Sequence, residues 1–167
     1  MDTDRAVVAQ QLGREPRAFR RVAVRCPFGL PAVTEQSPYS PDGEPFPTTY
    51  YVTCRHLVAA ISRLEADGGV ERWTRAAAGD PALAASRARA DDDQRAIRRA
   101  LAGGASGRDD GASLELGVGG AGRTGSLKCL HAHAAFALAN PGYALGERIV
   151  AEIEPLWPAR CCSGDGG

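Results

Sequence analysis

Three short strand patterns lie within the first 53 residues, and their spacing restricts the fold more than any other feature of the sequence. Residues 20–25 alternate, with Val22 and Val24 on one face, and residues 31–36 and 46–53 carry further runs of β-branched or aromatic side chains. The connections between these segments are too short for the crossover that parallel strands need. The sequence therefore predicts a small antiparallel sheet of about three strands from the N-terminal third of the chain.

Apolar residues at helical spacing cover most of the remaining chain. After Thr53, a good N-cap, Leu57 and Ile61 recur at helical spacing until Gly68 ends the run. Other helices are expected at about residues 3–12, 70–78, 81–101, 126–139 and 143–154, with a short strand at 113–116. The expected fold class is α+β, with the sheet packed against four to six α-helices.

The length of 167 residues suits one domain. We expect this domain to cover residues 1–156, with a mobile linker at 103–112 that is rich in Gly, Ala, Ser and Asp, and a disordered tail at 157–167. The 31 glycines and prolines (20 and 11) indicate a modest core with long connections.

The charge balance excludes some classes of partner. Twenty basic and twenty acidic residues cancel, which removes the general electrostatic argument for binding nucleic acid or an anionic membrane. No run approaches the roughly 18 apolar residues of a membrane span, and the first residues are charged. We expect a cytoplasmic protein. The predominance of Arg over Lys is attributed to a GC-rich genome.

Three cysteines are candidates for a shared metal site. Cys26, Cys54 and Cys129 each lie at the end of a predicted element, and a reducing compartment disfavours structural disulfides. Three thiolates and one imidazole would satisfy tetrahedral zinc, and the same set could hold an iron–sulfur cluster. The separations of 28 and 75 residues match no zinc-finger spacing, however, so ordinary buried thiols remain the alternative.

The fourth ligand is left open between two histidines. Positions i and i+4 share a helix face, which favours His133 as the partner of Cys129 over His131. Cys54 also admits a second interpretation, as a nucleophile whose thiolate is stabilised by the start of a helix.

A glycine-rich loop precedes these histidines. Residues 117–122 match G-x-G-x-x-G, but the strand, the βαβ unit and the later acidic residue of a dinucleotide site are missing. The P-loop is also excluded, because Ser126 stands where its lysine is required. A weaker prediction survives, in which Arg123, Ser126 and Lys128 at a helix start receive a phosphate or carboxylate, with a plain flexible loop as the alternative.

Four ordered segments together resemble an uncharacterised bacterial family called domain of unknown function 501. These segments are Arg25–Pro31, Pro45–Cys54, Ile61–Glu65 and Lys128–His131, and the resemblance covers about residues 20–150. The family is best known from actinobacteria and has no established activity. The resemblance implies that the family's motifs include Cys26, Cys54, Cys129 and His131, which makes His131 the fourth ligand, against the helix geometry. Arg55 departs from the family, where a proline usually follows the second cysteine.

Two functional hypotheses follow. The first is a cytoplasmic protein with a Cys/His metal site, structural or catalytic, where Lys128 and Arg123 steady a phosphate-like anion during metal-assisted hydrolysis. The second is a non-catalytic interaction module, in which the Ala-rich helix at 81–101 binds a protein partner and the cysteines are buried and free.

Overall fold

The computed structural model describes residues 2–120 and 125–162 and confirms the predicted sheet. Strands β1 (Phe19–Arg25), β2 (Pro31–Gln36) and β3 (Tyr50–Val52) form an antiparallel sheet in the order β1-β2-β3. β3 is shorter than predicted, because Pro47, which has no N–H to donate, lies in the segment before it.

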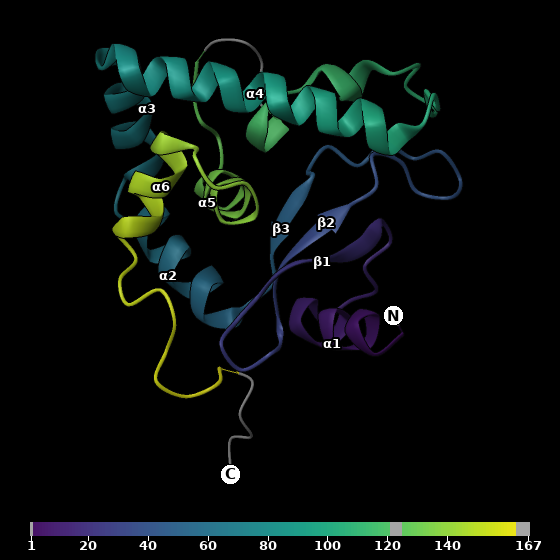
Figure 1. The fold of residues 1–167 in the computed structure, drawn as a ribbon, viewed down its shortest axis with the longest axis horizontal. Coiled ribbons are helices and arrows are strands. Elements are labelled where there is room, and N and C mark those ends of the chain that lie inside the picture. Colours follow the sequence, from purple (N-terminus) through teal and green to yellow (C-terminus); the bar gives the residue numbers. More distant parts are fainter. Residues whose placement is uncertain (1, 121–124, 163–167) are drawn as a thin grey trace.

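Helices make up the rest of the regular structure and confirm the α+β class. They are α1 (Asp2–Leu12), α2 (Arg55–Ala66), α3 (Gly69–Gly79), α4 (Pro81–Ala102), α5 (Leu130–Ala139) and α6 (Ala144–Ala151). Figure 1 shows α5 end-on in the middle of the molecule, with β3 on one side and α6 on the other. α4 runs across the top of the same view, and α1 lies beside β1.

The core is centred on α5, which is apolar around most of its circumference. Phe136 of α5 is buried and packs edge-on against Tyr50 of β3 and Tyr143 before α6, with ring centroids 5.7 Å apart in each pair. Such edge-to-face pairs add roughly 0.5–1.5 kcal/mol beyond the burial of their area. α5 is therefore held from both sides, which fixes the position of the residues at its N-terminus.

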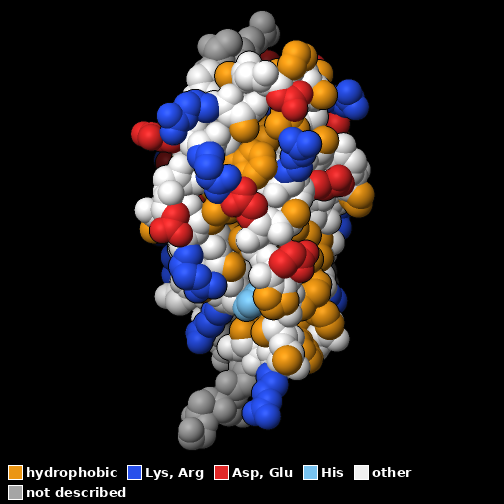
Figure 2. Space-filling model, turned by 90° about the vertical axis from the view of Figure 1, so that its left-hand side faces the viewer, with side chains coloured by type: hydrophobic (Ala, Val, Ile, Leu, Met, Phe, Trp, Pro, Cys, Tyr) orange, Lys and Arg blue, Asp and Glu red, His pale blue; other side chains and the backbone are white. Residues whose placement is uncertain are grey.

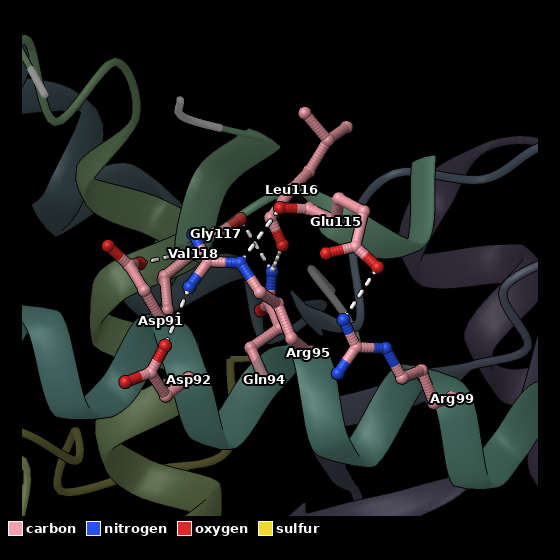
Figure 3. A network of polar contacts seen from close by, with 9 residues as sticks. All are labelled: Asp91, Asp92, Gln94, Arg95, Arg99, Glu115, Leu116, Gly117 and Val118. Atoms are coloured by element: carbon pink, nitrogen blue, oxygen red, sulfur yellow. Dashed lines mark hydrogen bonds and ion pairs between the residues drawn. The ribbon is translucent and has the colours of Figure 1, made fainter. Parts of the chain in front are cut away.

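A polar clamp on α4 holds the segment that leads towards α5 (Figure 3). Asp91 is buried and accepts a hydrogen bond from the Val118 N–H at 2.8 Å, and Gln94 donates to the Gly117 carbonyl at 2.6 Å. Arg95 donates to the Glu115 carbonyl at 2.8 Å. These bonds pair backbone groups of an irregular segment with side chains of α4, so they fix this segment against a rigid helix.

The segment before this clamp differs from the prediction. Residues Ala112–Glu115 form a 3₁₀-helix, η1, where a strand was expected. Asp109 accepts hydrogen bonds from the N–H groups of Gly111 and Ser113, and such local side-chain bonds favour a turn over a strand. In the expected linker, the Asp109 carboxylate accepts a 2.8 Å bond from the Tyr39 hydroxyl, and the Arg108 N–H donates to the Gly43 carbonyl.

Two helix starts also differ from the prediction. The N-cap of α2 is Cys54 and not Thr53, and the N-cap of α5 is Cys129, three residues after the expected Ser126. Neither cysteine forms a side-chain cap hydrogen bond. α5 begins late because Lys128 adopts a left-handed conformation with φ 65°, which a helix cannot include.

After α6 the chain returns along α2 (Figure 1). Arg72 forms an ion pair with Glu152 at 2.6 Å, and His56 Nε2 lies 2.9 Å from the Pro155 carbonyl oxygen. On the face shown in Figure 2, hydrophobic side chains are interspersed with charged ones. Among the described residues, no helix is both long and apolar enough to cross a membrane.

Candidate metal centre

The approach to α5 is a strained turn. Cys129 N–H donates to the Leu127 carbonyl at 2.8 Å, which closes a three-residue turn around Lys128 and its positive φ. A non-glycine residue in this conformation costs on the order of 1–3 kcal/mol, and such strain is concentrated at functional sites. The turn leaves Cys129 in an extended conformation, φ −146°, directly before the first helical residue.

Three side chains of types that can bind metals meet at this point. Glu65 comes from the last turn of α2, Cys129 is the N-cap of α5, and His131 lies in its first turn. One ligand atom from each, an oxygen, a sulfur and a nitrogen, lies within 4.8 Å of the others. In the described ranges 2–120 and 125–162, no other group of three such residues meets this condition.

Hydrogen bonds fix the orientation of the carboxylate and the imidazole. Glu65 Oε1 lies 2.9 Å from His131 Nδ1, and its Oε2 accepts the Leu130 N–H at 2.8 Å. On the other edge of the ring, His131 Nε2 lies 3.3 Å from the Val58 carbonyl oxygen and 3.2 Å from the Ser62 hydroxyl. The carboxylate therefore caps α5 and orients the histidine at the same time.

The local electrostatics favour an ionised thiol. Burial alone would raise the pKa of Cys129, but the hydrogen bond from His131 and the Ala132 N–H at the helix start outweigh it, so the pKa lies below its usual value. For His131, burial alone would lower the pKa, but contact with Cys129 and the charge of Glu65 raise it. A thiolate is the form of cysteine that binds metals and that attacks electrophiles.

The cluster opens into a cavity of about 600 Å³. Cys129 and His131 lie in its wall, together with residues from α1, β3 and the first half of α2. Cavities of this size accommodate small organic ligands. The cluster is therefore next to a space in which a small ligand could bind.

The other predicted ligands lie outside this cluster. Cys26 closes the turn between β1 and β2, where its N–H donates to the Leu30 carbonyl at 2.9 Å and its carbonyl accepts from Gly29. Cys54 is buried at the start of α2, and its sulfur lies 3.5 Å from that of Cys162. Of the five residues predicted as ligands, the structure thus brings only Cys129 and His131 together.

His133 is occupied elsewhere. It is fully buried, its Nδ1 lies 2.7 Å from the Tyr143 hydroxyl, and its Nε2 lies 3.2 Å from the Leu127 carbonyl oxygen. Burial lowers its pKa to about 4, so the ring is neutral at physiological pH. The structure places His131 and not His133 in the group with Cys129, because Cys129 is an extended N-cap and the i, i+4 rule applies only inside a helix.

Two residues of the predicted anion site, Ser126 and Lys128, do not line the cavity. Ser126 Oγ accepts the Lys128 N–H at 3.0 Å, and Lys128 Nζ lies 3.4 Å from the Gly120 carbonyl oxygen. Arg87 donates to the Ser126 carbonyl at 3.2 Å. Arg123 lies outside the described residues. Anion binding by these residues stays a prediction.

Sequence reasoning missed Glu65 as a member of the cluster and Cys162 as the neighbour of Cys54. In the sequence, Glu65 was noted only as the last residue of Ile61–Glu65, one of the segments that carry the family resemblance. Its role depends on the packing of the end of α2 against the start of α5, a contact across 65 residues of chain. No local pattern marks such a contact.

The fold and the cluster define a small α+β protein with a Glu/Cys/His group at the wall of a cavity. The chain belongs to the family described as protein of unknown function (DUF501), whose profile matches residues 22–151. The match includes all three residues of the cluster and confirms the resemblance seen in the sequence. Comparison with curated proteins gave no match, and comparison with solved structures gave none either.

Proposed function

We propose that the chain binds one zinc ion through Glu65, Cys129 and His131 and uses it to hydrolyse a substrate bound in the cavity. The observation that carries this proposal is the approach of three ligand atoms to within 4.8 Å at the cavity wall. Oxygen, sulfur and nitrogen are all common zinc ligands in proteins. These three residues match an iron–sulfur cluster poorly. Such clusters are held by several cysteine thiolates, whereas this group contains one cysteine.

The number of ligands favours a catalytic ion over a structural one. Structural zinc sites use four protein ligands, whereas catalytic sites use three and leave a position for water or substrate. Here three residues supply ligands, and two of them face the cavity. The hydrogen bond from Leu130 N–H to Glu65 orients one ligand from outside the coordination shell, as is usual at metal sites.

A bound zinc ion would supply a polarising charge and a water of lowered pKa. The residues of this chain would bind the ion and orient its ligands. Glu65, Cys129 and His131 would hold the ion at the end of the cavity, and Ser62, whose hydroxyl lies 3.2 Å from His131 Nε2, would orient the imidazole. The apolar wall formed by Val52, Val58 and Ala132 would limit access of bulk water.

A second candidate function is metal-free catalysis with Cys129 as the nucleophile. It is favoured by the position of the sulfur at the start of α5, near the Ala132 N–H and His131, which lower its pKa. This candidate uses the same residues but requires Cys129 to be free and reactive. A protein–protein role for α4 also stays a prediction.

Metal analysis separates these candidates. Protein purified without an affinity tag is expected to contain about one zinc ion per chain, and Cys129→Ser or Glu65→Gln is expected to lose it. Cys26→Ser is the matched control, because Cys26 is a buried cysteine outside the cluster, and it is expected to keep the zinc. Folding of each variant is checked by circular dichroism.

The opposite result supports the nucleophile. Zinc-free, folded protein in which iodoacetamide alkylates Cys129 faster than the other cysteines would exclude the metal function and favour the second candidate. Zinc that is retained in both Cys129→Ser and Glu65→Gln would show that the ion binds elsewhere. This result would contradict the assignment of Cys129 and Glu65 as zinc ligands.

A further inference from the structure

Two cysteines that are 108 residues apart in the chain meet at the start of α2. The sulfur of Cys54, the N-cap of α2, lies 3.5 Å from that of Cys162 in the C-terminal segment. A disulfide needs about 2.0 Å between its sulfurs, so the two would have to approach by about 1.5 Å. Cys162 lies in a turn and not in a helix or strand, so a small movement of this segment is enough. The two thiols are therefore within reach of a disulfide.

The contacts of the C-terminal segment fix the position of Cys162. In addition to the ion pair that follows α6, His56 Nε2 in the first turn of α2 lies 2.9 Å from the Pro155 carbonyl oxygen. Further along the segment, Leu156, Trp157 and Cys162 itself are partly buried against the hydrophobic core. Several contacts therefore bring this segment back to α2, and the approach of the two sulfurs does not depend on one of them alone.

The two thiols differ in access and in acidity. Cys54 is 2% exposed and burial raises its pKa, whereas Cys162 is partly exposed. Burial alone would also raise the pKa of Cys162, but the His56 N–H donates a hydrogen bond that lowers it. The Cys54 thiol and the Arg55 N–H lower it further, so this pKa lies below its usual value. N–H groups at a helix start stabilise a thiolate. Cys162 is therefore the thiol that a dissolved reagent reaches first.

We propose that Cys54 and Cys162 form a reversible disulfide site that reacts with small-molecule disulfides. The Cys162 thiolate attacks one sulfur of the small disulfide, which forms a mixed disulfide and releases one thiolate. The Cys54 sulfur then attacks the Cys162 sulfur, the internal disulfide forms, and the Cys54 proton goes to the second departing thiolate. Two thiols of the chain are oxidised, and one small disulfide is reduced to two thiols. Excess thiol reverses both steps.

This site adds a redox response to the fold. Disulfides in reducing compartments are usually transient and serve in catalysis or redox sensing. The internal disulfide fastens the C-terminal segment to the start of α2, where the next residues, Arg55 and Val58, line the cavity. Neither cysteine belongs to the metal cluster, so this site does not rest on the proposed function.

Oxidised glutathione is the probe that tests the site. The full chain is reduced, separated from the reductant, treated with oxidised glutathione, and digested with pepsin at low pH, which prevents exchange of disulfides. Mass spectrometry of the peptides is expected to show a Cys54–Cys162 disulfide that dithiothreitol removes. Cys161→Ser is the matched control, because the contact with Cys54 is made by Cys162 and not by its neighbour. This variant is expected to form the same disulfide.

Two further variants separate the roles of the thiols. Cys54→Ser is expected to stop the reaction after its first step, with glutathione retained on Cys162. Cys162→Ser is expected to lose the internal disulfide and to leave the buried Cys54 unmodified. Circular dichroism checks the fold of each variant. The unmodified chain and Cys161→Ser test the internal disulfide without any change to Cys54.

The internal disulfide in these two proteins, together with trapped glutathione on Cys162 in Cys54→Ser, supports the proposal whether or not zinc is bound. Three results would each overturn it. These are a disulfide from Cys54 to Cys161 or Cys26, glutathione that stays on Cys162 in the unmodified chain, and a Cys54 and Cys162 pair that does not react.

Discussion

The close approach of α5 and α6 at Gly146 gives a stability prediction with a defined magnitude. A Cβ at this position would lie 2.6 Å from Ala137 Cβ, 2.6 Å from Tyr143 Cδ2 and 2.9 Å from the His133 carbonyl oxygen. Carbon atoms in contact are normally about 3.5–4.0 Å apart. Replacement Gly146→Ala therefore requires the two helices to move apart by about 1 Å, since neither Ala137 nor the backbone carbonyl can rotate away.

Two opposing effects determine the size of the change. Overpacking of this kind costs about 1–3 kcal/mol, whereas alanine gains up to about 1 kcal/mol over glycine in a helix. We expect a net loss of about 1–2 kcal/mol in the free energy of unfolding. Gly79→Ala is the matched control, because Gly79 is in α3 and a Cβ there has nothing within 4 Å. It is expected to gain about 0.5–1 kcal/mol.

Urea unfolding of the two variants and the unmodified chain measures both effects, provided that the three unfolding slopes agree. In thermal unfolding, each 1 kcal/mol corresponds to about 2–4 °C for a chain of this size. Equal or greater stability of Gly146→Ala relative to Gly79→Ala would show that α5 and α6 do not pack as described. The position of the cluster at the start of α5 would then need revision.

Three further perturbations test separate parts of the structure. Hydrogen peroxide is expected to oxidise Cys54 and Cys162 to a disulfide, because their sulfurs lie 3.5 Å apart. Peptide mapping by mass spectrometry detects the linked pair. A disulfide from Cys54 to another cysteine would contradict the position of Cys162 beside Cys54. Gln94→Ala removes a 2.6 Å donor from the buried Gly117 carbonyl, which keeps the Gly120 N–H at 3.1 Å, and is expected to cost about 0.5–1.5 kcal/mol in urea unfolding; an unchanged midpoint would refute the clamp on α4. The ion pair with Arg72 holds the pKa of Glu152 below 4.5, so its stabilisation is present above that pH and is lost as the pH falls through the lowered value. Glu152→Gln should reduce the pH dependence of unfolding in this range by less than about 1 kcal/mol, and an unaltered profile would contradict the pair.

Much of the fold was predictable because its signals are local. The alternation of residues 20–25 and the short connections to the next two strands were enough to predict an antiparallel sheet, which the structure confirms. The helical spacing of Leu57 and Ile61 likewise predicted α2, and both residues are fully buried. The 3₁₀-helix at Ala112–Glu115 was not predictable in this way, because it depends on hydrogen bonds that backbone N–H groups donate to Asp109, which periodicity does not reveal.

The site was predictable only in part, for a related reason. Cys129 and His131 were identified from a local motif, but their geometry depends on the left-handed Lys128, which delays the start of α5 and changes which histidine meets the cysteine. Glu65 joins them only through the packing of two helices. Cys54 was expected in the same site, yet the returning C-terminal segment places Cys162 beside it. Contacts between distant segments have no signature in a single sequence.

The central claim is that one sulfur, one nitrogen and one carboxylate oxygen of this chain bind the same zinc ion. X-ray absorption at the zinc edge of tag-free protein tests it most directly, because Zn–S and Zn–N or Zn–O distances differ, at about 2.3 Å and 2.0–2.2 Å. We predict one sulfur per zinc, contributed by Cys129, with the remaining ligands nitrogen or oxygen. A spectrum with three sulfurs, or with none, would contradict the assignment of Glu65, Cys129 and His131 as the metal centre.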